Sequence, residues 1–290
     1  MTTMTTNLNR AHRELYRRGP DEAFATLKDL HEHCRQERQY STDVWQPPHR
    51  LQPQVADGEL RLAFDTGDSI GLNDWSFSQV CRLASVSKET INRVQPETAM
   101  MALRDTLPHA DKPVQLLTTG QTVRSVHGVS YTRLWNSELV ETIRDVAVDF
   151  TPPQAAINGG TGLYCGEQDM FCFLIDPTGW IDIDGEAFAP GFFVWNSEVG
   201  RRSLGMQTFW FQKICQNHIV WDAVEVIEFS RKHTANVRDG LLEIRRHIEA
   251  LIAKRDARRD QFADVLKKAM QTRLGSDSDE VAKELGNHGI

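Results

Sequence analysis

The chain has 290 residues, of which 40% are hydrophobic and 25% charged, and its formal net charge is −7 at pH 7. These proportions are typical of globular proteins, and they exclude a collagen, a low-complexity chain and wholesale disorder. No apolar run approaches the roughly 18 residues of a membrane-spanning helix, and the N-terminus lacks the apolar core of a signal peptide. The five cysteines form no CxxC pair. We therefore expect reduced thiols in a cytoplasmic protein with no membrane association.

The first expected element is an N-terminal helix over residues 19–40, which follows a flexible segment at 1–18. Pro20 suits the first turn of a helix, where its missing N–H costs nothing, and apolar residues recur behind it at helical spacing. The proline-rich stretch 41–58 then predicts an extended linker.

A strand at 59–64 is expected next, and three short helices follow it. Asn73 and Ser87 suit the N-caps of the first two, because their side chains accept a hydrogen bond from the first helical turn. Pro96 begins the third helix and Pro108 stops it.

The middle of the chain is expected to form β-hairpins around one helix. Residues 114–117 and 122–126 flank a Thr-Thr-Gly-Gln turn, which is a hairpin pattern. A helix over 137–146 follows, with Asn136 or Ser137 as its cap. Further strands are expected at 163–175, 180–183, 192–195 and 203–220.

The last part of the chain, 231–274, is expected to be helical, with a flexible end at 275–290. Some of its apolar residues are spaced four and three apart, like the a and d positions of a coiled coil. They are Val237, Leu241, Ile244, Ile248 and Leu251. This seam predicts that the tail packs on a second copy of the chain, so we expect a homo-oligomer.

The order of elements separates strands from helices and shows no βαβ alternation. It predicts an α+β fold with a central antiparallel sheet of hairpins, flanking helices and a coiled-coil-like C-terminal tail. The core domain is expected to span 57–230. Basic side chains outnumber acidic ones in 231–273, whereas acidic side chains outnumber basic ones in 56–230. A basic tail on an acidic body indicates either a binding site for a polyanion or simply a helix face exposed to solvent.

Five segments in one order resemble a known family. They are the stretch 71–84 (GLNDWSFSQVCRLA), the stretch 124–139, the NSEVG motif at 196–200, the Cys-x-Asn at 215–217 and the Arg-Lys-His-Thr at 231–234. Together they resemble the phage/plasmid-like proteins of domain of unknown function 932 (DUF932), over about residues 57–270. His218 departs from that family, which usually has glycine there. The resemblance implies a mobile-element genome and a cytoplasmic setting, and it implies no activity.

Metal binding has weak support in the sequence. His31 and His33 point about 200° apart on a helix, so they are not expected to share a metal ion with Cys34. A group of carboxylates surrounds two turns and either holds a divalent cation or serves only to form those turns. The group consists of Asp176, Asp182, Asp184 and Glu186. Glu198 has no partner carboxylate at a known spacing, so a structural role is expected for it. We expect no metal, no cofactor and no catalytic residue.

Two patterns point to nucleic acid. Residues 80–94 are similar to a repressor-type helix-turn-helix, although they also suit a packed helix pair inside a larger domain. Aromatic and basic side chains interleave in two places, as in sites where unpaired bases stack and phosphates meet cations. The residues expected to contact nucleic acid are Arg124, Tyr131, Arg133, Trp135, Arg201, Arg202, Trp210 and Lys213.

The sequence therefore favours a non-enzymatic nucleic-acid-binding protein of a phage or plasmid that handles or anneals single-stranded DNA. Two alternatives stay open. One is a metal-dependent enzyme that uses the carboxylates of 176–186, and the other is a host-directed protein-binding module whose contact face is the acidic body. The choice between DNA and RNA and the stoichiometry of the oligomer are not determined by these patterns.

Overall fold

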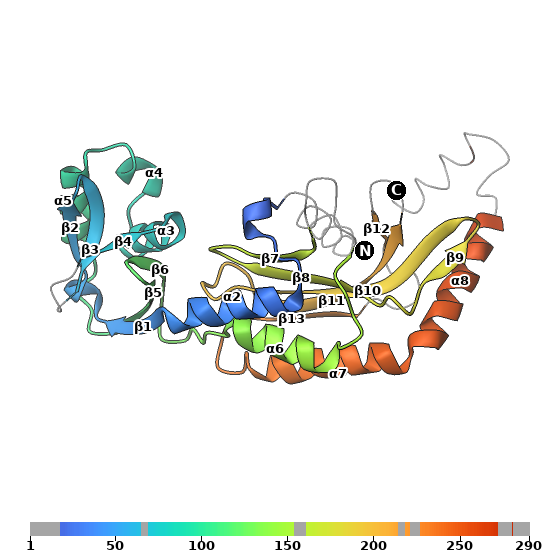
Figure 1. The fold of residues 1–290 in the computed structure, drawn as a ribbon. Coiled ribbons are helices and arrows are strands. Elements are labelled where there is room, and N and C mark those ends of the chain that lie inside the picture. The colour runs from blue at the N-terminus through green and yellow to red at the C-terminus, as the bar shows by residue number, and fades with distance from the viewer. Residues whose placement is uncertain are drawn as a thin grey trace.

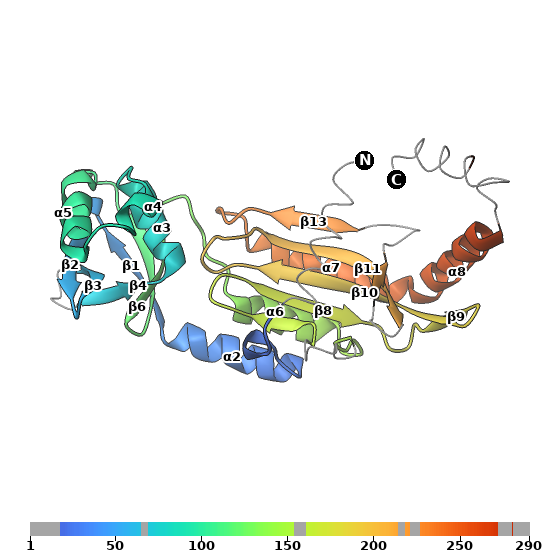
Figure 2. The ribbon, with the colours of Figure 1, turned by 90° about the horizontal axis from the view of Figure 1, so that it is seen from above.

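The computed structural model describes residues 18–64, 69–153, 161–213, 218–220, 227–271 and 280. Except for Arg18 and Glu280, the two terminal segments expected to be flexible lie outside these residues. The chain is α+β, as the sequence predicts, but it builds two sheets and two lobes where one central sheet was expected. Both lobes are seen side by side in Figure 1 and from above in Figure 2. None of the described helices is both long and apolar enough to span a membrane.

The small lobe, residues 41–127, is a six-stranded sheet with three helices. The strands run in the order β1-β5-β6-β4-β3-β2, and every neighbouring pair is antiparallel except β4 and β6. Their bounds are β1 Ser41–Gln46, β2 Gln52–Ala56, β3 Glu59–Ala63, β4 Ser69–Leu72, β5 Val114–Thr119 and β6 Thr122–His127. The helices are α3 Asp74–Leu83, α4 Lys88–Ile91 and α5 Pro96–Thr106. Their apolar sides share one core with the sheet, which includes Leu62, Val80, Leu103 and Leu116.

The expected linker at 41–58 is wrong, because this stretch forms the two edge strands of the small lobe. β1 pairs with β5 along its whole length and β2 pairs with β3, with a short 3₁₀ turn at Pro48–Arg50 between them. An edge strand tolerates polar side chains and even a proline such as Pro53, since one side of its backbone needs no partner. The hydrophobic alternation that identifies a strand in a sequence is therefore missing here.

The large lobe, residues 18–40 and 131–271, is an antiparallel sheet covered on one face by three helices (Figures 1 and 2). The strands are β7 Leu163–Cys165, β8 Met170–Ile175, β9 Ile181–Ile183, β10 Glu186–Asn196, β11 Leu204–Lys213, β12 His218–Val220 and β13 Glu228–Arg231. The helices on this face are α2 Leu27–Gln39, α6 Asn136–Val146 and α7 Asp239–Ala253. Alternate residues of β10 face opposite ways: Phe192 packs under the helices, whereas Phe193 joins an aromatic cluster on the other face.

Two helix starts differ from the sequence expectation. Pro20 opens only a single 3₁₀ turn, Pro20–Glu22, and α2 begins at Leu27 with Thr26 as its cap. The reason is tertiary, because the Phe24 N–H donates to the Leu163 carbonyl at 2.9 Å and so ties this segment to the sheet. Likewise, the N-cap of α6 is Trp135 rather than Asn136 or Ser137.

The helical tail packs on its own chain. Val237, Ile244 and Ile248 are fully buried in the large-lobe core, and Leu241 and Leu251 pack against it. The heptad seam therefore has its partners inside the lobe, and self-association through the seam stays a prediction. The second tail helix, α8 Arg255–Gln271, extends over the far end of the sheet, where the Phe262 ring stacks on Trp210 at 3.9 Å between ring centres.

Candidate nucleic-acid interface

An open cleft of about 330 Å³ lies where the two lobes meet. Three segments line it: the end of β6 with the connector behind it, the turn between β10 and β11, and the segment after β13. The lining residues are His127, Tyr131, Gly200, Arg201, Arg202, Ser203, Lys232, His233 and Thr234. No carboxylate of the described residues is among them. The cleft is thus a basic, polar site on a chain whose net charge is negative.

The turn between β10 and β11 is held in place by its own side chains. Ser197 Oγ accepts a hydrogen bond from the Arg201 N–H at 2.8 Å and donates to the Gln168 carbonyl at 2.6 Å. Gly200 has a φ of +69°, and a Cβ built there would lie 2.6 Å from Cε1 of His127. Only glycine fits a left-handed position with so close a neighbour. The turn is therefore specified by sequence, and it directs Arg201 and Arg202 to the cleft.

One wall of the cleft is a stack of rings. His127 lies parallel to Tyr131 with 3.7 Å between ring centres, and His233 also stacks against Tyr131, with 5.4 Å between ring centres. The Tyr131 hydroxyl donates to the Glu198 carbonyl at 2.9 Å. Burial, helped by the nearby Arg133 charge, lowers the pKa of His127 to about 3, and burial lowers the pKa of His233 to about 4. Both imidazoles are therefore neutral at pH 7, and the positive charge of the cleft comes from its arginines and lysine.

Two of these cations have no acidic partner among the residues that the structure describes. Arg201 and Lys232 are exposed, and neither forms an ion pair with any described residue. The Arg201 guanidinium lies 5.1 Å from the ring centre of Trp75, whose indole N–H donates to the Val199 carbonyl at 2.8 Å across the lobe junction. Arg202, in contrast, is paired with Asp169. Arg201 and Lys232 are thus the cations available to an anionic ligand.

Behind the cleft lies a buried polar network centred on Glu198, whose side chain is 1% exposed. Its Oε2 lies 3.3 Å from Nη1 of Arg124, and its Oε1 accepts from the Asn136 N–H at 2.8 Å, which caps α6. Arg133 donates to the Glu198 carbonyl and pairs with Asp43 at 2.7 Å. Burial raises the pKa of Glu198, and the Arg124 charge opposes that rise. Glu198 therefore has the structural role that the sequence predicts, because it joins the turn, α6 and the small lobe.

The structure separates the eight residues expected to contact nucleic acid. It brings Tyr131, Arg201 and Arg202 together in the cleft. It buries Arg124 and Arg133 in ion pairs at 6% and 5% exposure, so these two expectations are corrected. Their charges are neutralised by acids that come from distant parts of the chain.

The remaining three residues lie away from the cleft. Trp210 is fully buried against Phe262, so it offers no face to a base. Trp135 packs under the guanidinium groups of Arg38 and Arg133. Lys213 is at the opposite end of β11 from the cleft. An aromatic side chain that fills a core and one that stacks on a base are indistinguishable in the sequence.

Sequence analysis missed four residues of the site: His127, His233, Lys232 and Trp75. Lys232 and His233 belong to the Arg-Lys-His-Thr segment and Trp75 to the stretch 71–84, both of which carry part of the family resemblance, and that resemblance was the one available signal. No spacing rule links residues around 75, 127, 200 and 232, because their proximity arises from how the lobes meet.

The helix-turn-helix-like segment 80–94 is a packed pair inside the small lobe. Its second helix, α4, is a single turn of four residues that Ser87 caps, and Lys88 pairs with Asp74 at 2.5 Å. Val80 and Ile91 are buried in the core. So short a helix has little surface for the major groove, and the interpretation as a helix pair is the one that the geometry favours.

The carboxylates of 176–186 hold the fold and do not converge. Asp176 is buried, pairs with Arg255 of α8 and accepts from the Thr178 hydroxyl at 2.7 Å. Asp182 accepts from the Gly185 N–H at 3.1 Å in the turn between β9 and β10, and Glu186 accepts from Gln212. Within the described part of the chain these carboxylates form no group close enough to share a cation. The metal-enzyme alternative has no support at this position.

Comparison of the chain with models of protein families, with curated proteins and with solved structures finds no match. The resemblance to domain of unknown function 932 stays a prediction, and a function has to be argued from the cleft itself.

Proposed function

We propose that this protein binds single-stranded nucleic acid and that the cleft between its lobes holds the sugar–phosphate backbone. The observation that carries the proposal is the convergence of Arg201, Arg202 and Lys232 on one open cleft that no described carboxylate lines. On a chain with a net charge of −7, such a cluster needs a local reason. A bound anion is the most direct reason, since cations that repel one another are stabilised by it.

The chemistry of the cleft suits a phosphodiester. The Arg201 guanidinium offers a planar set of donors, and Lys232 adds a mobile point charge. The hydroxyls of Ser203 and Thr234 lie in the same cleft as further donors. Trp75, under Arg201, is half-buried and leaves part of its ring for an unpaired base.

The size of the cleft favours single strands. About 330 Å³ is at the lower end of the volumes of small-ligand pockets, enough for one nucleotide. A duplex, which is about 20 Å wide, reaches only the rim, and its bases are paired and stacked away from Trp75. The proposal therefore requires tighter binding to a single strand than to the same sequence in a duplex.

Fluorescence anisotropy with labelled oligothymidine and a matched duplex tests this function. We expect Arg201→Ala combined with Lys232→Ala to weaken single-strand binding at least about tenfold. The slope of log affinity against log salt should become shallower by about 1.4 units, because each lost phosphate contact on a single strand changes the slope by about 0.7. The matched control is Arg93→Ala with Lys112→Ala, which removes the same charge from exposed positions of the small lobe.

Equal losses in the two double variants would show that only net charge matters, and they would refute the cleft as the site. A second titration adds a mononucleotide as competitor. If the mononucleotide binds as tightly as the oligonucleotide, the cleft belongs to a small phosphorylated ligand and the proposed function is wrong.

A further inference from the structure

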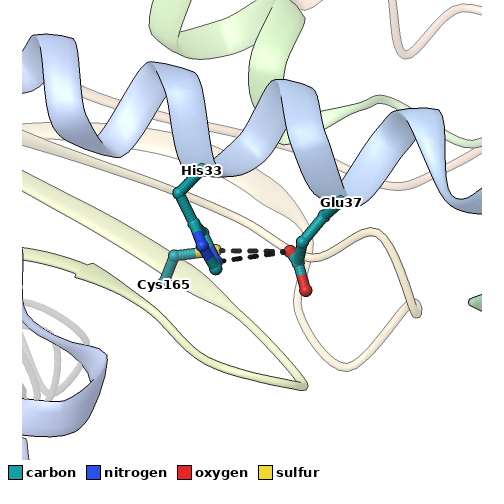
Figure 3. Close-up of side chains that lie close together, drawn as sticks. All are labelled: His33, Glu37 and Cys165. Atoms are coloured by element: carbon teal, nitrogen blue, oxygen red, sulfur yellow. Dashed lines mark hydrogen bonds and ion pairs between the residues drawn. The ribbon is translucent and has the colours of Figure 1, made fainter.

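A thiol, an imidazole and a carboxylate meet between α2 and β7, away from the basic cleft (Figure 3). His33 and Glu37 are four residues apart on α2, so both project from the same side of the helix. Cys165 ends β7 and faces them. The three potential ligand atoms all lie within 4.8 Å of one another, and within the described part of the chain no other such group occurs. We propose that His33, Glu37 and Cys165 bind a zinc-class transition-metal dication.

The distances are close to those of a tetrahedral site. Nε2 of His33 lies 3.7 Å from Oε2 of Glu37, and Sγ of Cys165 lies 4.0 Å from the same oxygen. With metal–ligand bonds of about 2.0–2.1 Å to nitrogen and oxygen and about 2.3 Å to sulfur, ligands of a tetrahedral zinc ion are about 3.3–3.6 Å apart. The two separations from Glu37 therefore need to close by only a few tenths of an ångström around the ion, and the nitrogen of His33 and the sulfur of Cys165 lie within 4.8 Å of each other.

The donor set selects the class of metal. A thiolate with an imidazole suits Zn²⁺ and its neighbours, whereas Mg²⁺ and Ca²⁺ prefer oxygen ligands alone. One thiolate and one carboxylate also neutralise a dication, which matters because Cys165 is only 4% exposed. His33 and Glu37 are half-buried and give the ion a path from solvent.

The surroundings orient these ligands as the outer partners of a metal site do. Arg124 lies 3.7 Å from Oε1 of Glu37, which leaves Oε2 for the metal. Nδ2 of Asn136 lies 3.8 Å from Sγ of Cys165, and Asn136 is in turn fixed by a 2.8 Å hydrogen bond from Asn196. Such partners hold the orientation of metal ligands.

Three protein ligands leave a fourth position for water or another small ligand, which is the pattern of a reactive rather than a purely structural zinc site. The neighbouring Cys34 is fully buried and is not part of the group. The sequence expectation of no metal missed this site because Cys165 is 128 residues away from Glu37 in the chain.

Titration of the full chain with Co²⁺, after chelator treatment and under reducing conditions, tests the proposal directly. We expect one equivalent to bind and to give a thiolate-to-metal charge-transfer band, and Zn²⁺ to displace it. His33→Asn, Glu37→Gln and Cys165→Ser should each weaken binding more than about 100-fold, since loss of an outer partner alone costs 10- to 100-fold. His31→Asn on the same helix and Cys81→Ser in the small lobe are the matched controls.

His33 is half-exposed, so His33→Asn keeps the test valid if Cys165→Ser fails to fold, and circular dichroism identifies that case. Absence of the charge-transfer band in the folded parent protein would overturn the proposal. So would full binding in His33→Asn, because the metal would then lie elsewhere. The nucleic-acid proposal does not depend on either result.

Discussion

The Glu198–Arg124 pair gives the sharpest stability prediction. Both side chains are almost fully buried, with Nη1 of Arg124 3.3 Å from Oε2 of Glu198. Glu198→Leu leaves the guanidinium with Glu37 at 3.7 Å and the Glu167 carbonyl at 3.2 Å as its remaining acceptors. Breaking one side of a buried pair costs about 3–5 kcal/mol. The Asn136 N–H also loses its acceptor, at about 1 kcal/mol. We expect Glu198→Leu to lower the free energy of unfolding by about 4–6 kcal/mol.

The double variant separates this reasoning from a simple packing defect. Burial raises the pKa of Glu198 despite the Arg124 charge, so the ionised pair contributes little net stability. Arg124→Met with Glu198→Leu removes both charges and should be less destabilised than Glu198→Leu alone. Urea unfolding followed by tryptophan fluorescence and circular dichroism measures Glu198→Leu, Arg124→Met and the double variant. The argument is refuted if the double variant loses at least as much unfolding free energy as the two single variants lose together.

Three further predictions concern the turn, the tail and the histidines. Gly200→Ala should cost about 1–3 kcal/mol and weaken oligonucleotide binding, because a Cβ there meets His127 and φ is +69°; unchanged unfolding and binding curves would contradict this. Deletion of 231–290 should abolish cooperative unfolding of the large lobe, since it removes three fully buried aliphatic residues, and light scattering on the full chain tests self-association separately. His233 is neutral in the folded protein down to about pH 4, whereas the unfolded chain takes up a proton below about pH 6.5. Stability should therefore fall as pH drops from 6.5 to 4, and the fall should be shallower in His233→Asn; parallel profiles would exclude the histidine as a cause.

Local chemistry explains which elements could be predicted. Asn73 and Ser87 cap their helices as expected, with side-chain oxygens accepting from the N–H groups of Ser76 and Thr90. These interactions span three residues, so the sequence contains all the information they need. The strands β5 and β6 were predictable for the same reason, because a short turn joins them.

Elements fixed by distant partners were not predictable. The α6 cap is the carboxylate of Glu198, 62 residues away, so no pattern around Asn136 could identify it. The edge strand β1 owes its existence to pairing with β5, whose first residue Val114 is 68 positions after its partner Gln46. The heptad seam shows the same limit, since spacing identifies an apolar face but not whether the face packs on a second copy or, as here, on the same lobe.

The candidate site depends on which arginines are neutralised. Arg124, Arg133, Arg201 and Arg202 look alike in the sequence, and all four were expected to meet phosphate. Asp43, Glu198 and Asp169 pair with three of them. Of these four arginines, Arg201 alone has no acidic partner among the described residues. Lys232, in the same cleft, likewise has none among them. Net charge could not reveal this, because the pairing is a tertiary property.

Arg124 lies between the two proposed sites, which makes their independence testable. It contacts Glu198 behind the cleft and Glu37 in the metal group. Only substitution of Arg124 should impair both nucleic-acid binding and metal binding. In the described structure Arg201 and Lys232 touch neither Glu37 nor Cys165, and His33 does not line the cleft. We therefore expect His33→Asn to lose Co²⁺ but keep oligonucleotide affinity within about twofold. The Arg201→Ala, Lys232→Ala variant should show the reverse. A folded His33→Asn protein that no longer binds the oligonucleotide would mean that α2 and the cleft act as one site.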